Sequence, residues 1–133
     1  MAVGKSSLSA GEIIRAVLIE DPEVSARVKK VYPVVEDSAE LPYIVYRRTQ
    51  LEQLPIKGNG NGNRVSDMVA IEVLCYTEGY TEGVELAEAV RAALDNKTAA
   101  SGGLVMRSCY LTDSEESWQA DAYVQKMIFT IKI

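Results

Sequence analysis

The sequence predicts an α+β fold: a mostly antiparallel sheet of about four to five strands with two helices packed on one face. Three observations lead to this prediction. Two segments carry apolar residues at helical spacing, and five others are β-rich or alternate at period two. Their order along the 133 residues is helix, strand, strand, strand, helix, strand, strand. We expect a flexible N-terminus over residues 1–8 and one domain over residues 9–133, since this length is typical of a single domain.

The first helix is predicted over residues 9–20. Ser9 and Glu12 have the spacing of a capping box, and Leu8 with Ile13 has that of a hydrophobic staple. One apolar stripe follows at helical spacing and comprises Ile13, Ile14, Val17 and Leu18. These signals together predict a helix whose apolar side faces the core.

Two strands follow this helix. Asp21–Pro22 ends it and is typical of the start of a short second turn, which we expect to run through Ala26. Val28–Val34 is β-rich and is the first predicted strand. After a polar, acidic loop, the Leu41–Pro42 step restricts the backbone to extended geometry and opens the second strand, residues 43–49.

A low-complexity loop of alternating glycine and asparagine comes next, flanked by Lys57 and Arg64. It is either a tolerated surface loop or a segment that becomes ordered against a neighbouring subunit, and its two cations suit an acidic partner. Arg47 and Arg48 point to opposite faces of the preceding strand, so one is expected in solvent and the other at a subunit contact or beside a carboxylate. The candidate assembly residues are Arg47, Arg48, Lys57, Gly58, Asn59, Gly60, Asn61, Gly62, Asn63 and Arg64.

The third strand and the second helix form the clearest pattern in the chain. The strand spans residues 67–76, with Glu72 and Tyr76 on one face. Its other face carries Val69, Ile71, Val73 and Cys75. The helix is expected to begin at Thr81, and its buried stripe comprises Leu86, Val90, Ala93 and Leu94.

Two more strands are predicted at the end of the chain, over Leu104–Leu111 and Tyr123–Ile133, after a turn at Ser101–Gly103. We expect an acidic, solvated loop around Asp113–Glu116 to join them. A calcium-binding loop needs oxygen ligands at alternating positions around a central glycine, and this segment lacks that register. Trp118 and the seven tyrosines exceed the needs of a core of this size, so some are expected at the surface, where they favour protein contacts.

The composition argues against several classes of function. The net charge of −5 disfavours non-specific nucleic-acid binding, which depends on clustered Lys and Arg. The chain has no histidine, which removes the most common general base and metal ligand. Cys75 and Cys109 fall in phase with apolar strand positions and are expected to be buried. Gly4–Ser6 mimics the end of a phosphate-binding loop but lacks the preceding strand and glycine. We therefore expect no catalytic residue, no cofactor and no metal.

The same reasoning excludes a membrane protein. No apolar run approaches the roughly 18 residues that a membrane-spanning helix needs. The N-terminal residues lack the apolar core of a secretory signal. The sequence thus predicts synthesis in the cytoplasm.

With these elements placed, the chain resembles a family of tailed-phage proteins, the tail-completion or tail-terminator family. The resemblance covers about residues 9–133. It rests on the first helix leading into Arg27–Tyr32, on the strand Leu41–Val45, and on the strand Val69–Tyr76 followed by the helix Glu85–Leu94. The specificity comes from the order and spacing of these segments, since none is a catalytic signature. The glycine–asparagine loop departs from the shorter connection expected in this family.

The resemblance implies a structural subunit of a phage or prophage tail. It implies a ring, typically sixfold, at the head-proximal end, which stops tail-tube assembly and joins tail to head. The implied partners are other copies of the chain, the tail-tube protein and a head-completion or connector protein. DNA passes through without specific binding, so we expect an acidic inner wall. The expected location is the virion tail after assembly and the host bacterial cytoplasm during synthesis.

Uncovered strand edges at Val28–Val34 or Ile128–Ile133 are expected to join neighbouring subunits by extending the sheet. The alternative interpretation is a ferredoxin-like regulatory module that binds a small molecule between paired subunits. That fold alternates strand–helix–strand units, and three successive strands before the second helix count against it. An enzyme is the third possibility, but no pair of titratable residues stands out to support one.

Overall fold

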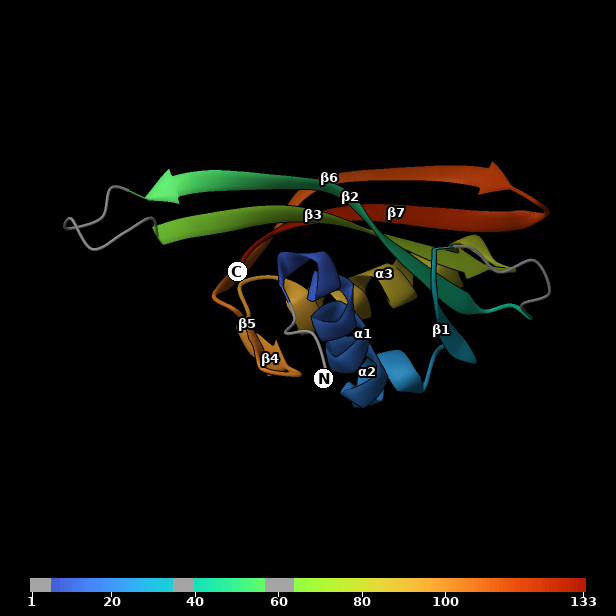
Figure 1. The fold of residues 1–133 in the computed structure, drawn as a ribbon. Helices are drawn as coiled ribbons and strands as arrows, with labels where there is room; N and C mark the ends of the chain where they lie inside the picture. Colours follow the sequence, from blue (N-terminus) through green and yellow to red (C-terminus); the bar gives the residue numbers. More distant parts are fainter. Residues whose placement is uncertain (1–5, 35–39, 57–63) are drawn as a thin grey trace.

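The computed structural model describes residues 6–34, 40–56 and 64–133 (Figure 1). A 3₁₀ turn at Ser7–Ser9 precedes the first α-helix. The helices are α1 (Ala10–Glu20), α2 (Pro22–Ser25) and α3 (Tyr80–Leu94). The strands are β1 (Lys30–Pro33), β2 (Tyr43–Ile56), β3 (Arg64–Thr77), β4 (Ala99–Ser101), β5 (Leu104–Met106), β6 (Ser108–Gln119) and β7 (Ala122–Lys132).

The main sheet has five strands in the order β1-β2-β3-β7-β6. Strand β1 runs parallel to β2, and every other neighbouring pair in this sheet is antiparallel. Strands β4 and β5 form a separate two-stranded hairpin. Helices α1 and α3 both lie on one side of the main sheet (Figure 1). The predicted α+β fold with its mostly antiparallel sheet is therefore confirmed.

The core lies between this sheet and the two long helices. In α1 the apolar stripe is buried as predicted, with Val17 packed at its margin. In α3 the predicted stripe is buried as well. The strands contribute alternate residues: Val69, Ile71, Val73 and Cys75 from β3, and Met127, Phe129 and Ile131 from β7. These layers are held together by the burial of apolar side chains, which contributes about 25 cal/mol of stability per Å² of apolar surface removed from water.

The end of β3 packs closely against the first turn of α3. A Cβ atom added at Gly83 would lie 2.8 Å from the Thr77 hydroxyl oxygen, a distance that real Cβ atoms essentially never show. Thr77 is fully buried, and its hydroxyl donates a hydrogen bond of 2.8 Å to the carbonyl oxygen of Gly79. The sheet and the helix therefore approach here at a distance that only glycine permits.

The start of α1 differs from the prediction. Leu8 is 65% exposed whereas Ile13 is buried, so the predicted hydrophobic staple does not form. Ser9 has φ −93° and ψ 11°, which is near helical rather than extended geometry, and its side chain makes no capping hydrogen bond. The preceding 3₁₀ turn takes that place: the Leu8 N–H donates to the Ser6 hydroxyl oxygen at 3.3 Å. The predicted capping box is therefore wrong.

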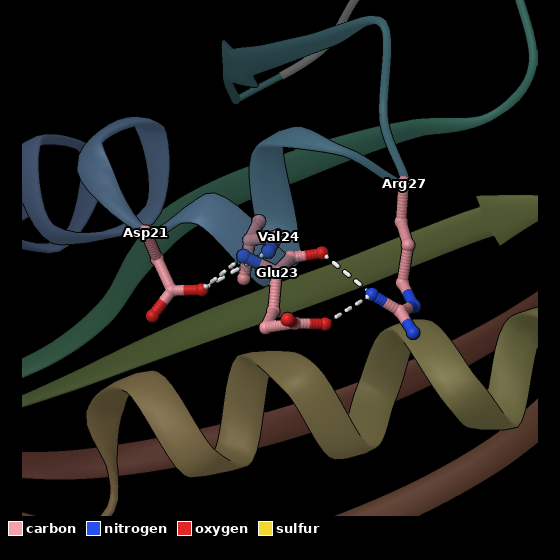
Figure 2. A network of polar contacts seen from close by, with 4 residues as sticks. All are labelled: Asp21, Glu23, Val24 and Arg27. Atoms are coloured by element: carbon pink, nitrogen blue, oxygen red, sulfur yellow. Dashed lines mark hydrogen bonds and ion pairs between the residues drawn. The ribbon is translucent and has the colours of Figure 1, made fainter.

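The short turn after α1 is confirmed. The Asp21 carboxylate accepts hydrogen bonds of 3.0 Å from the backbone N–H groups of Glu23 and Val24, which caps α2 (Figure 2). Arg27 Nη1 donates to the carbonyl oxygen of Glu23 at 3.0 Å and to its carboxylate at 2.8 Å. Pro22 lies at the first helical position, where a backbone N–H would have no partner within the helix, so its missing N–H costs nothing. Asp21–Pro22 therefore starts α2 through its own local contacts.

The end of the chain also differs from the prediction. The segment Asp113–Glu116, expected to be a loop, lies within β6 and pairs with β7. The chain turns instead at Ala120–Asp121, which adopt φ values of 50° and 60°. The predicted strand Leu104–Leu111 divides at Arg107 into β5 and β6, because its first part pairs with β4, a strand that the sequence did not indicate. The turn at Ser101–Gly103 is confirmed, with Gly102 and Gly103 at φ 59° and 84°.

Only one of the two predicted free edges is correct. Strand β1 is an edge of the main sheet, and its Pro33, which has no N–H to donate, is tolerated there. Residues Ile128–Ile133 are not an edge, because β7 lies between β3 and β6. Strand β6 forms the second edge.

Replacing Gly83 by alanine is expected to lower the free energy of unfolding by about 1–3 kcal/mol, because the new methyl group displaces Thr77. Gly79→Ser is the matched control. A Cβ atom there meets only the Glu82 Cβ atom at 3.9 Å, and serine is a preferred capping residue. Urea unfolding followed by circular dichroism measures both variants. Equal stability of the two variants would contradict the close approach described here.

Replacing Asp21 by alanine is expected to lower the free energy of unfolding by about 0.5–2 kcal/mol, because two N–H groups of α2 lose their acceptor. Asp21→Asn keeps a side-chain oxygen at the same place and serves as control. Thermal denaturation of both variants checks this expectation. A loss as large in Asp21→Asn as in Asp21→Ala would show that charge, rather than capping, matters at this position.

Candidate assembly surfaces

The side of the sheet opposite α1 and α3 is covered by none of the described helices (Figure 1). We call this side the open face. A row of tyrosines crosses it from β1 to β3. The ring centroids of Tyr32 and Tyr43 lie 5.9 Å apart at an interplanar angle of 76°. The rings of Tyr43 and Tyr76 stack at 4.7 Å and 12°. Aromatic pairs in these geometries contribute about 0.5–1.5 kcal/mol beyond the area they bury.

The tyrosine row presents uncharged rings. Burial raises the pKa of both Tyr43 and Tyr76 above the ordinary value for tyrosine, so their hydroxyls stay protonated at neutral pH. The row therefore offers polarizable ring surface with a few hydroxyl groups. Such surface is typical of protein–protein contacts.

Arg47 and Glu72 lie beside this row in the middle of the open face. Their side chains form an ion pair of 3.2 Å between neighbouring strands. Glu72 is only 7% exposed, whereas the arginine side chain is half exposed. A carboxylate this well buried needs a partner, so Arg47 is placed as its counter-ion. Arg48 alternates to the other face and is exposed.

The predicted assembly residues are thus only partly described. Residues 57–63, which include Lys57 and the glycine–asparagine loop, lie outside the described residues. Arg64 begins β3, and its backbone pairs with Ile56 at the end of β2. The two strands form a long hairpin that extends beyond the helices (Figure 1). Arg47 and Arg48 lie within the same hairpin.

A second aromatic cluster lies near the tip of the β6–β7 hairpin. Trp118 and Tyr123 are paired across the two strands, with ring centroids 4.8 Å apart at 72°. Tyr80, at the start of α3, contacts Tyr123 edge to face at 5.8 Å. Trp118 is 57% exposed and Tyr80 is 47% exposed. The sequence anticipated surface aromatics but did not indicate that these three would meet, because the turn that pairs them was predicted elsewhere.

Glu116 organises this cluster. Its carboxylate accepts hydrogen bonds from the Tyr80 hydroxyl at 2.9 Å and from Gln125 Nε2 at 2.9 Å. The bonds from Gln125 and Tyr80 hold the pKa of Glu116 below its ordinary value. The hydrogen bond from its hydroxyl to Glu116 raises the pKa of Tyr80 above its ordinary value. Residues of the cluster line a surface hollow of about 200 Å³, which is small for a ligand site.

The described residues offer no metal-binding arrangement. They contain no group of three or more histidine, cysteine or acidic side chains that could hold a metal ion. Cys75 and Cys109 are buried, as predicted. Burial raises the pKa of Cys75 far above its ordinary value and that of Cys109 to about 12, so both thiols stay protonated and unreactive. Over the same residues, no helix is both long and apolar enough to span a bilayer.

Comparison with known proteins identifies the family. A chain of the solved structure described as "Virion of native gene transfer agent (GTA) particle" matches with a TM-score of 0.67 and 16% sequence identity, over 96% of this chain and 98% of that chain. At this identity the likeness shows a shared fold. No curated protein sequence matches significantly. The family model described as tail completion protein gp17 matches residues 12–133. The chain therefore belongs to the gp17 family of tail completion proteins and is a structural component of a phage-type tail.

Proposed function

We propose that this protein forms a closed ring at the head-proximal end of a phage or prophage tail, where it stops tube assembly and joins tail to head. The observation that carries this proposal is the match of residues 12–133 to the tail completion family. The fold supports it, because its exposed features are two sheet edges, an open face and two projecting hairpins. These features suit contacts with other proteins.

The two ends of the sheet suit two different partners. The β2–β3 hairpin extends beyond the helices on one side, and the β6–β7 hairpin extends on the other (Figure 1). In a ring, one of these ends meets the tail-tube protein and the other meets the head connector. The net charge of −5 suits a conduit through which DNA slides without being held, with aspartate and glutamate lining the lumen.

A non-catalytic role agrees with the chemistry of the chain. It has no histidine, and both cysteines are buried with raised pKa values. The ferredoxin-like alternative gains no support, because three strands of the main sheet precede α3.

Deleting the gene from its phage or prophage tests the proposal. We expect tails without heads and tube lengths that are no longer uniform, because nothing closes the growing end. Electron microscopy of lysates measures both features, and expression of the intact chain from a plasmid is the control. Tails of uniform length attached to heads in the deletion strain would contradict the proposal.

Shortening the glycine–asparagine loop tests its role in assembly. Replacing Gly58–Asn63 by Asn-Gly leaves a short turn between β2 and β3, and loop closure then changes the free energy of unfolding by less than about 1 kcal/mol. We expect the monomer to fold and the number of head-joined tails to fall, because the loop loses its contact with a neighbour.

The control for this variant keeps the length of the wild-type loop but is built from glycine and serine. It separates loop length from the asparagine side chains. Unchanged assembly in both variants, with folding intact, would show that the loop is only a tolerated connection.

A further inference from the structure

We propose that neighbouring copies of this protein join through unlike sheet edges, with β6 of one copy against β1 of the next. The inference rests on the ring proposed above and specifies which surfaces close it. Strands β1 and β6 are the two edges of the main sheet. An edge strand presents unpaired N–H and C=O groups, which pair readily with a second strand. In β6 the Cys109 carbonyl and the Leu111 N–H already bond to Asn96 and Asp95, so the contact uses the part of the strand after Leu111.

The strand directions fit this contact. Strand β1 is parallel to β2, and three antiparallel steps lead from β2 to β6, so β6 runs opposite to β1. Two copies related by rotation about an axis along the strands keep the same direction. The contact between them is therefore antiparallel, and the sheet continues from one subunit to the next. Because β1 has only four residues, side chains on both faces must supply much of the contact.

On the open face the two edges carry opposite charges. Lys30 alternates with the buried Val31 and so lies on the open face of β1. Its ammonium group lies 5.4 Å from the Tyr32 ring, and it has no carboxylate partner among the described residues. Asp113 and Glu115 lie on the open face of β6 and are exposed.

The partners already present leave these acids available. Among the described residues, the Asp113 carboxylate accepts a local bond from the Ser114 N–H, at 2.8 Å. Glu115 lies 3.5 Å from Lys126, with its side chain 65% exposed. The Lys29–Glu40 pair is closer, at 2.9 Å. Within the described part of the chain, Lys30 is therefore the lysine of the β1 edge that has no carboxylate partner.

On the helix side, β1 borders a hollow and β6 carries an exposed indole ring. A hollow of about 210 Å³ lies beside β1, and Arg15, Leu18, Ile19 and Val28 are among the residues that line it. Trp118 of β6 alternates to the helix side and is largely exposed. Opposite residues in a continuous sheet share a face, so the indole and the hollow lie on the same side. An antiparallel register that sets Lys30 opposite Glu115 places Trp118 level with the segment just before β1, which contributes Val28 to the hollow.

Charge also disfavours contacts between like edges. Pairing β6 with β6 would bring Asp113 and Glu115 of both copies together, and pairing β1 with β1 would do the same for Lys30. Like charges set opposite each other at an interface repel and so disfavour wrong partners. Unlike edges therefore meet, which is the arrangement that closes into a ring when the rotation allows it.

Charge reversal at each edge tests the interface. The β1-reversed variant carries Arg15→Glu and Lys30→Glu, and the β6-reversed variant carries Asp113→Lys and Glu115→Lys. All four side chains are exposed, so both variants should fold. Each variant alone has two edges of the same sign, and we expect at least about tenfold weaker association. An equimolar mixture should form alternating rings of wild-type mass, because each edge then meets its opposite.

The matched control for the β6-reversed variant is Glu85→Lys with Glu88→Lys, which makes the same change in net charge on exposed positions of α3. It should assemble like the wild type. Native mass spectrometry in solution and electron microscopy on tail tubes measure assembly for every sample.

Trp118→Ala tests the helix-side contact separately. We expect at least about tenfold weaker association, because an exposed aromatic anchor that fills a pocket is typical of an interface hot spot. Val105→Ala, at an exposed position of β5, is the control and should leave assembly unchanged. Circular dichroism confirms that each variant is folded before its mass is measured.

The possible results separate this inference from the proposed function. Wild-type rings that persist in both reversed variants and in Trp118→Ala would overturn the interface and leave the tail-end ring intact. A wild-type chain that stays monomeric both in solution and on tail tubes would overturn the ring, and the interface with it. Rings restored only in the mixture of reversed variants would support both.

Discussion

The fold depends on the packing of two helices against one face of a five-stranded sheet. Strands β3 and β7 lie at the centre of that sheet, and their alternate residues meet the apolar stripes of α1 and α3. This burial provides most of the driving force for folding, since apolar area removed from water is the dominant favourable contribution. At Gly83 the helix and the sheet approach at a distance that only glycine permits. The opposite face and both sheet edges lie outside this buried core and remain available to partners.

The sequence was most informative where one face of an element is fully buried. A strand or helix that seals the core must repeat its apolar residues with the period of its backbone, so the stripes of α1 and α3 and the alternation in β3 were all predicted correctly. The burial of Cys75 and Cys109 followed from the same periodicity. Asp21–Pro22 was recognised because its capping bonds are local.

The failures lie where distant contacts decide the structure. Residues Asp113–Glu116 are acidic and exposed, which resembles a loop, but β7 supplies the backbone partners that make them a strand. The turn at Ala120–Asp121 lacks the glycine that usually marks a hairpin. Because this turn was misplaced, the contact between Trp118 and Tyr123 was not predicted, and a free sheet edge was expected at β7 instead of β6. Of the candidate assembly residues, Arg47 is the counter-ion of a buried carboxylate, a role that depends on pairing between strands.

The proposed assembly rests on the family of the chain and on the two edges of its sheet. The chain belongs to a family of tail completion proteins, and the edge strands of its sheet carry Lys30 in β1 and Asp113 and Glu115 in β6. Amide hydrogen exchange of the assembled protein, compared with the free chain, tests this most directly. We expect slower exchange in β1 and β6, whose free sides become paired, and unchanged exchange in β3, which already has neighbours on both sides. Protection that appears only on the helices, with both edges exchanging as in the free chain, would contradict the account.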